Sequence, residues 1–235
     1  YRLLRQDPIH PVSSQPSPAA IKTALDLAAS ASDRVIAVHL SNKLSGIYRN
    51  AQAQALKDYP DKVAVIDSRQ LSVTEGLITY RIARAVEEGK SFEEIVTEAP
   101  KWIDNTCIYT DIYTLKYMVR GGRVPPLTGF VASLLNLKPI VSLDKNGKAQ
   151  VFGKSFSRAR NMRKIIKIVE SEFQNRGIWE YAIVHAEAED RAHQYAEQLF
   201  TITGKKPAWI MPLPPVVGVH NSPGTVGIGV SYAKS

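Results

Sequence analysis

Two short, nearly unbroken apolar runs limit what the first third of this chain can form. The runs at 35–40 and 63–66 each lead into polar residues, and each is followed by a segment in which apolar residues have helical spacing. Continuous apolar runs of this length are typical of parallel strands buried on both faces. Strands that alternate with helices imply right-handed crossovers, so the sequence predicts a parallel sheet covered by helices.

Local signals in the same region predict where helices start. Pro18 stands where a helix can begin, because its missing N–H costs nothing in a first turn. Ser91 and Glu94 have the spacing of a capping box. The segment 73–86 is predicted to be a helix, whereas the Pro- and Ser-rich stretch 6–18 is predicted to be an extended loop.

The second half of the chain has a different pattern. The pair Asn146-Gly147 separates the apolar runs 137–143 and 149–152, which is a strong hairpin signal. A long helix is predicted to have an apolar face from Ala159 to Phe173, and the chain ends in a glycine-rich segment after His220. Further elements are predicted as strands at 106–109, 179–185 and 208–213 and a short helix at 115–119.

These patterns predict an α/β fold with two domains. The first, over residues 1–104, is a parallel-sheet α/β/α domain. The second, over residues 105–235, is an α/β domain with a mixed sheet, because a hairpin and mixed connections replace the regular strand–helix alternation.

Composition excludes several classes of protein. The 235 residues are 44% hydrophobic and 22% charged, which is typical of a globular chain able to bury a core and argues against intrinsic disorder. No run approaches the ~18 apolar residues of a membrane-spanning helix, and no secretory signal is visible at the start. The single cysteine, Cys107, is expected to be a small core residue in a reducing, cytoplasmic compartment.

The formal net charge of +8 favours an anionic partner. A basic nucleic-acid-binding module is one such possibility, although the chain has neither an arginine-rich tail nor an aromatic–basic RNA signature. The polar face of the long helix carries a basic stripe, which is either a solvated surface or a docking surface for an acidic partner. The stripe consists of Arg158, Arg160, Arg163, Lys164 and Lys167.

Three polar clusters lie in predicted loops, at 13–17, 41–46 and 220–224. Ligands of open parallel sheets bind beyond the carboxyl ends of the strands. Ser45-Gly46, at the start of a predicted helix, offers a hydroxyl, free backbone N–H groups and the positive end of the helix dipole. Taken singly, such serine-rich loops are ordinarily turns or helix caps.

Taken together and in order, six segments resemble the bacterial DegV family along essentially the whole chain. The family patterns are close to T-S-Q-P-S, L-S-G-T-Y, a strand ending in D-S, Y-L-x-x-G-G-R-I, L-L-x-I-K-P-I and H-x-G-P-G. The corresponding segments here are SSQPS, LSGIY, VIDS, YMVRGGRV, LLNLKPIVSL and HNSPGTVGIG.

The resemblance implies a two-domain carrier of the EDD fold that buries one long-chain fatty acid and presents its carboxylate. Relatives of this kind offer the carboxylate to a separate fatty acid kinase, which forms an acyl phosphate for phospholipid metabolism. The resemblance therefore implies no catalytic residues, no metal and no cofactor in this chain, and no P-loop is present. The ligand-binding residues that it implies, together with the Ser-Gly helix start, are Ser13, Ser45, Gly46, Arg123 and His220.

The chain departs from the family pattern at a few positions. Ser13 keeps the hydroxyl of the family's threonine, Ile47 replaces a threonine, and Ser222 replaces the first glycine of H-x-G-P-G. The replacement at Ile47 removes a hydroxyl near the head group, and Ser222 is expected to stiffen the loop that bears His220. The resemblance also implies about 50 residues ahead of Tyr1 with a first strand ending in Asp-Ser, whose absence would leave an open sheet edge and an incomplete pocket.

An enzyme remains the main alternative to a carrier. Ser45 would be the nucleophile of an acyl hydrolase, with His220 as its base and Asp67 orienting that base. Against this, L-S-G-I-Y lacks the G-x-S-x-G elbow that exposes such a serine. Without the resemblance, Arg123 would be a surface turn residue and His220 a structural histidine.

Overall fold

The fold contains two separate sheets, seen in a computed structural model that describes residues 1–6, 10–123, 138–155 and 157–234. The small sheet pairs β1 (Val35–His39) with β2 (Val63–Asp67) in parallel. The large sheet has six strands in the order β5-β4-β3-β8-β6-β7, of which only β6 and β7 are parallel. Its strands are β3 (Thr106–Asp111), β4 (Lys138–Leu143), β5 (Ala149–Ser155), β6 (Ile178–His185), β7 (Ile210–Pro212) and β8 (Val226–Tyr232). The predicted α/β class, with a small parallel sheet and a larger mixed sheet, is confirmed.

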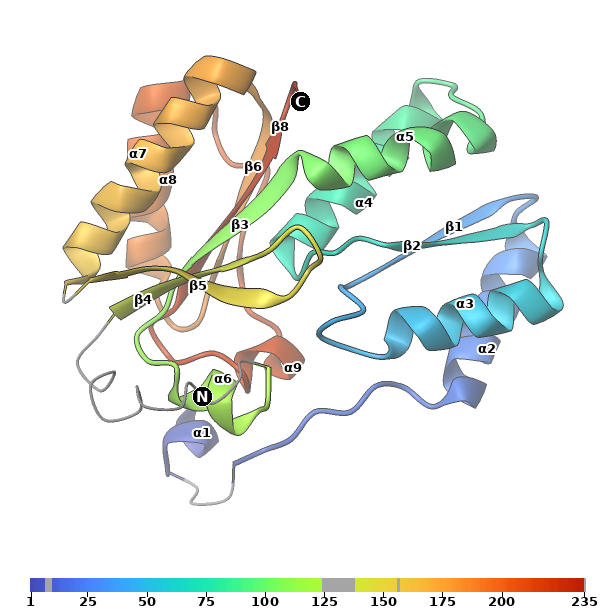
Figure 1. The fold of residues 1–235 in the computed structure, drawn as a ribbon, viewed down its shortest axis with the longest axis horizontal. Helices are drawn as coiled ribbons and strands as arrows, with labels where there is room; N and C mark the ends of the chain where they lie inside the picture. Colours follow the sequence, from blue (N-terminus) through green and yellow to red (C-terminus); the bar gives the residue numbers. More distant parts are fainter. Residues whose placement is uncertain (7–9, 124–137, 156, 235) are drawn as a thin grey trace.

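Helices cover the small sheet on both faces and the large sheet on its outer face (Figure 1). α2 and α3 pack on one face of the small sheet, and α4 and α5 pack on the other. α7 and α8 cover the large sheet. The helices are α1 (Arg2–Gln6), α2 (Pro18–Ala31), α3 (Ile47–Asp58), α4 (Val73–Glu87), α5 (Phe92–Asp104), α6 (Lys116–Arg120), α7 (Arg158–Arg176), α8 (Glu189–Thr203) and α9 (Pro215–Gly218).

The local helix and hairpin signals are confirmed. α2 begins at Pro18 after Ser17, whose side chain accepts the Ala20 N–H at 3.2 Å. Ser91 and Glu94 form a complete capping box at the start of α5. The Asn-Gly turn joins β4 to β5 as an antiparallel hairpin. Residue 137, where the first strand of that hairpin was predicted to start, lies outside the described residues.

The first two strands are covered on both faces, as expected, but their residues are less buried than expected. All five residues of β1 are only partly buried, and in β2 only Val63 is fully buried. Both strands are edges of a two-stranded sheet, so the helices cannot cover their side chains completely. A continuous apolar run thus indicated the strands correctly but not their burial.

The glycine-rich C-terminal segment forms one of the two central strands of the large sheet, which the sequence did not predict. β8 lies between β3 and β6, and all seven of its residues are buried. A Cβ at Gly229 would lie only 2.8 Å from the Thr74 side chain, so glycine lets α4 approach the sheet closely. The strand alternates small and apolar residues, so it lacks the alternation of polar and apolar residues by which a strand is usually recognised.

α4 packs against both sheets. Ile78 and Ile82 belong to a core with the apolar residues of the small sheet. Val73 and Leu77 pack instead with Ile108 of β3 and its neighbours in the large sheet. The start of α4 therefore lies where the two sheets meet, and a domain boundary between residues 104 and 105 stays a prediction.

Candidate ligand-binding site

A cavity of about 690 Å³ lies between the small sheet and the large sheet. The volume falls within the range of roughly 300–1,000 Å³ typical of small-molecule sites. The large sheet, the start of α4 and the loops that follow β1, β2, α6 and α9 contribute to its lining, which is mainly apolar. Apolar side chains from these different elements include Leu40, Leu71, Ile112, Val141, Val184 and Val217.

Four of the polar residues in the lining are those expected at the head group, Ser13, Ser45, Arg123 and His220, and we call these four the polar corner. All four residues line the cavity and all four are partly buried. They come from the loop before α2, the loop before α3, the turn after α6 and the loop after α9. Gly46, also expected in the site, is not among the lining residues but is the first residue before α3.

Direct contacts hold the two serine loops at this corner. Ser13 Oγ lies 2.6 Å from His220 Nε2, a hydrogen bond between residues 207 positions apart. Gln15 packs on the start of α3 so closely that a Cβ at Gly46 would lie 2.5 Å from Gln15 Oε1. The loop of Ser13 therefore presses against both the His220 loop and the helix start beside Ser45.

The start of α3 is available to an anion. Ser45 Oγ accepts the Ile47 N–H at 3.3 Å, and Gly46, with no side chain, provides no cap for the helix. The free N–H groups and the dipole of a 12-residue helix favour negative charge at this end. Ile47, which takes the place of a hydroxyl-bearing family residue, lines the cavity.

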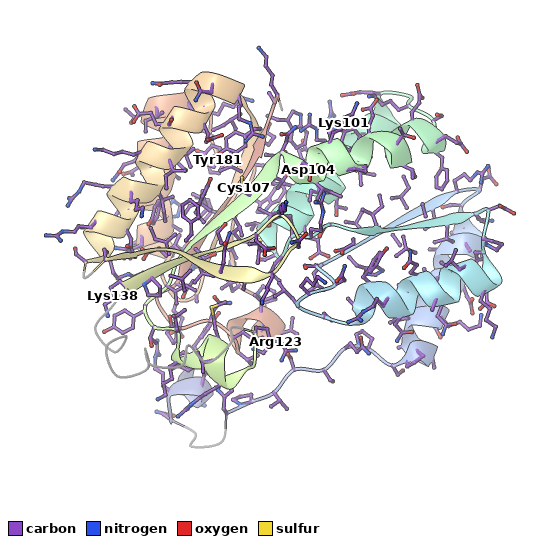
Figure 2. The ribbon with its side chains drawn as sticks, viewed as in Figure 1. Lys101, Asp104, Cys107, Arg123, Lys138 and Tyr181 are labelled. Atoms are coloured by element: carbon purple, nitrogen blue, oxygen red, sulfur yellow. The ribbon has the colours of Figure 1, made fainter. Side chains whose placement is uncertain are left out.

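Arg123 supplies positive charge from the turn after α6. Its backbone N–H donates to the Met118 carbonyl at 3.1 Å, and its guanidinium donates to the Gly121 carbonyl at 2.5 Å. The side chain lies beside α6 and α9, far from α7 and α8 (Figure 2). This turn therefore fixes a cation at the polar corner.

His220 is held as a neutral side chain over the same turn. Burial is the main cause that lowers the pKa of His220, and the neighbouring Arg123 and His10 lower it further. Its Nδ1 is buried and has no hydrogen-bond partner among the described residues. A side chain at Gly121 would collide with that nitrogen, so the glycine lets the imidazole lie against the turn.

Ser222 anchors the loop that bears His220. The fully buried Ser222 hydroxyl accepts the backbone N–H groups of Tyr113 at 3.1 Å and Thr114 at 3.3 Å. It also lies 3.1 Å from Thr225 Oγ1. The serine thus ties this loop to the segment after β3, consistent with the expectation that it stiffens the loop.

The family comparison agrees with the motif pattern. The family model described as "Uncharacterised protein, DegV family" matches residues 1–233. The chain belongs to the DegV family. A DegV domain-containing protein of Clostridium perfringens is 31% identical over 221 residues, which is 94% of this chain and 78% of that relative. A DegV domain-containing protein of Clostridium acetobutylicum is 30% identical over 196 residues, covering 83% of this chain and 69% of the relative.

Solved DegV structures have the same fold. A DegV family protein from Thermus thermophilus, described as binding fatty acid, matches with a TM-score of 0.88 and 26% identity, covering 98% of this chain and 82% of that one. A fatty acid binding DegV family protein from Streptococcus agalactiae matches with a TM-score of 0.87, 23% identity and the same coverage. A stearic acid-binding protein from Eubacterium ventriosum has a TM-score of 0.87 and 21% identity, covering 99% and 82%.

The polar groups of this DegV chain are not arranged as a Ser-His-Asp triad centred on Ser45. The hydroxyl bonded to His220 is that of Ser13. Asp67 accepts the backbone N–H groups of Asn42 and Arg69 at 3.2 and 3.0 Å and also accepts from the Asn42 side chain. An orienting carboxylate would have to reach His220 Nδ1, which has no partner among the described residues.

One cavity residue, Glu75, was missed by the sequence analysis. It lies in the first turn of α4, lines the cavity and is partly buried. Burial raises the pKa of Glu75 to about 7, opposed only by a hydrogen bond from the Leu40 backbone. An acidic residue in a first helical turn is ordinarily solvated, so no sequence pattern indicated that Glu75 lies in the cavity wall.

Two searches bear on other classes of site. Within the described ranges, no helix has the length and apolar character needed to cross a bilayer. In that same part of the chain, no group of three or more His, Cys, Asp or Glu side chains is placed to hold a metal ion. The lining of the cavity instead combines hydroxyl groups and a guanidinium with apolar side chains.

Proposed function

We propose that this chain is a fatty-acid-binding carrier that buries one acyl chain in the cavity and holds its carboxylate at the polar corner. The observation that supports the proposal is a mainly apolar cavity whose lining also includes the Ser13 and Ser45 hydroxyls and the Arg123 guanidinium. The similarity to the Thermus thermophilus protein, at 26% identity over almost the whole chain, supports it.

An amphiphile suits both halves of this site. Each methylene removed from water contributes about 0.8 kcal/mol, so an acyl chain gains most of its affinity from the apolar wall. The carboxylate requires charge-assisted hydrogen bonds, because an unpaired buried charge is very costly. Ser45, the start of α3 and Arg123 together offer a hydroxyl, backbone N–H groups and a guanidinium.

The Ser13–His220 hydrogen bond can orient a second hydroxyl toward the ligand. If neutral His220 carries its proton on Nε2, the ring donates to Ser13 Oγ and leaves the Ser13 hydroxyl proton free for the carboxylate. The unprotonated Nδ1 then lies against Gly121. In this arrangement His220 acts as an orienting group and not as a base, since a fatty acid carboxylate is already ionised at neutral pH.

Two measurements test the carrier function. Mass spectrometry of an organic extract of the purified protein is expected to find a long-chain fatty acid, and delipidated protein is expected to bind added stearate with one-to-one stoichiometry. A serine-reactive fluorophosphonate is expected to leave both Ser13 and Ser45 unlabelled. Failure to bind fatty acid, or stoichiometric labelling of either serine, would contradict the proposal.

The finer part of the proposal is that a separate, ATP-dependent fatty acid kinase acts on the presented carboxylate in the cytoplasm. Arg123 would offset the charge of the carboxylate and then the charge that develops during phosphoryl transfer. Arg123→Ala is therefore expected to lower acyl-phosphate formation severely while fatty acid affinity falls only modestly. If binding and turnover fall by the same factor, Arg123 is an anchor for the carboxylate and presentation is not its role.

A further inference from the structure

Glu75 places an ionisable carboxyl group in the wall of a mainly apolar cavity. It lies in the first turn of α4, and its neighbours Leu71 and Leu40 also line the cavity. The adjacent α4 residues Val73 and Leu77 are at most 2% exposed and pack against the large sheet. The polar group therefore lies within the region that the acyl chain would occupy.

The carboxyl group is not neutralised by a cation. Among the residues that the structure describes, no arginine, lysine or histidine forms an ion pair with Glu75. Burial raises its pKa to about 7, and the only opposing interaction is the hydrogen bond from the Leu40 backbone. At neutral pH, Glu75 therefore populates both the protonated and the ionised form.

A role in capping α4 does not explain Glu75. Ser72 and Glu75 have the same spacing as the capping box of Ser91 and Glu94, yet no side-chain cap forms at Ser72. Ser72 has φ +57° and ψ −126°, far from the extended conformation that Ser91 has. This backbone conformation prevents the usual cap, and the Glu75 carboxyl group meets the Leu40 backbone instead.

Filling the cavity changes the surroundings of this group. An acyl chain that displaces water from the cavity leaves the remaining hydrogen-bonding positions of Glu75 facing methylene groups. A buried polar group without a partner costs roughly 1–3 kcal/mol, and more when it is charged. A chain that carries a hydroxyl near Glu75 avoids this cost, because the hydroxyl can donate to the carboxylate and accept from the protonated acid.

We propose that Glu75 is a specificity-determining residue that makes this protein a carrier of hydroxylated fatty acids. The inference rests on the proposed fatty acid binding and adds the substrate class. The carboxylate of the ligand stays at the polar corner, where Arg123 provides a positive charge. Glu75 instead recognises a hydroxyl group on the acyl chain. The cavity would determine how far along the chain from the carboxylate this hydroxyl must lie.

The test measures dissociation constants of delipidated protein for stearic acid and for stearic acids hydroxylated at carbon 2, 3, 10 or 12. At least one hydroxystearate is expected to bind about tenfold more tightly than stearate, which is the effect of about one hydrogen bond. Glu75→Leu is expected to tighten stearate binding and to remove this preference. Glu75→Gln, which retains hydrogen bonding without charge, is expected to keep the preference.

The controls separate this inference from the proposed function. Ser45→Ala is expected to weaken stearate and every hydroxystearate by the same factor, since it acts on the carboxylate. If wild-type protein binds stearate at least as tightly as every hydroxystearate, or if Glu75→Leu leaves the ratios unchanged, the specificity role is wrong while fatty acid binding stands. If neither stearate nor any hydroxystearate binds, the carrier function itself is wrong.

Discussion

The four helices α2 to α5 start in two different ways, depending on whether they begin at the surface or at the cavity. α2 and α5 begin at the surface, where Ser17 and Ser91 each accept a backbone N–H of the first turn and Glu94 completes a capping box. α3 and α4 begin at the cavity, and neither Gly46 nor Ser72 provides a side-chain cap. At these two uncapped starts, Ser45 and Glu75 line the cavity.

A comparison of α4 with α5 shows why one helix start has a side-chain cap and the other does not. Both helices begin with Ser-x-x-Glu, at Ser72–Glu75 and at Ser91–Glu94, so sequence does not distinguish them. A helix cap contributes about 1 kcal/mol to stability, and the positive φ of Ser72 has a cost of a similar order. The cavity side of the fold is thus less stable than its sequence would allow, which is typical of a binding site.

The largest expected difference between the Ser72–Glu75 and Ser91–Glu94 motifs is in how the free energy of unfolding depends on pH. The folded protein holds the pKa of Glu75 at about 7, above the usual 4.5, so between these values the folded state binds more protons than the unfolded state. Stability therefore falls as the pH rises through this window, by up to about 3 kcal/mol. Glu75→Gln is expected to remove this loss in denaturant unfolding of the ligand-free protein.

Glu94→Gln provides the control of opposite sign. Hydrogen bonds from Ser91 lower the pKa of Glu94, so its ionised form stabilises the fold above the usual pKa and the contribution is lost as the pH falls. The free energy of unfolding of Glu94→Gln should therefore fall relative to wild type as the pH rises, whereas that of Glu75→Gln should increase. A pH-independent difference for Glu75→Gln would show that its carboxyl group is solvated in the folded state.

The start of α3 should show its effect on ligand affinity. Ser45→Ala removes a hydroxyl that we place next to the carboxylate, and a hydrogen bond to a charged group contributes roughly 1.5–3 kcal/mol. Fatty acid affinity is expected to fall about ten- to a hundredfold, measured by calorimetric titration.

Ser41 and Ser14 are the matched controls for Ser45. Ser41 is fully buried outside the cavity lining and donates to the Gly147 carbonyl at 2.8 Å, so Ser41→Ala should lower stability more than affinity. Ser14 lines the cavity but is exposed, and Ser14→Ala should change affinity less than Ser45→Ala. Equal losses of affinity in all three variants would show that Ser45 is the wrong serine.

Much of the fold could be predicted from the sequence because its signals are local. Pro18, the Ser91–Glu94 box and the Asn146-Gly147 turn each determine backbone structure within a few residues, and each predicted the right element. β8 was missed because its position between β3 and β6 depends on pairing with residues more than 40 positions away. Burial of β1 was overestimated because the number of strands beside it is not a local property.

The candidate site likewise contains residues that sequence motifs predicted and one residue whose position depends on the three-dimensional fold. Ser13, Ser45, Arg123 and His220 were selected from motif resemblance, and the structure places all four in the lining of one cavity. No property of the sequence around Glu75 distinguishes it from Glu94, because the difference arises from the backbone angles of Ser72 and from packing against two sheets. Roles of the individual residues in ligand binding stay predictions until affinities are measured.

A smaller effect is expected at the capped start of α5. Ser91→Ala removes the acceptor for the Glu94 N–H and should lower the free energy of unfolding by about 1 kcal/mol. Fatty acid affinity should not change, because Ser91 does not line the cavity. A change in affinity larger than twofold would contradict the separation between surface and cavity helix starts.

The smallest expected effect is a gain of stability from Ser72→Gly. Glycine adopts positive φ without a steric penalty, so the substitution relieves strain of roughly 1–3 kcal/mol at φ +57°. The greater freedom of glycine in the unfolded chain offsets about 0.5–1 kcal/mol of that gain. The net result should be a modest increase in the free energy of unfolding, where Ser91→Gly should give a decrease. A loss of stability in Ser72→Gly would show that the serine side chain holds the start of α4 in place, and that the two helix starts differ less than their backbone angles indicate.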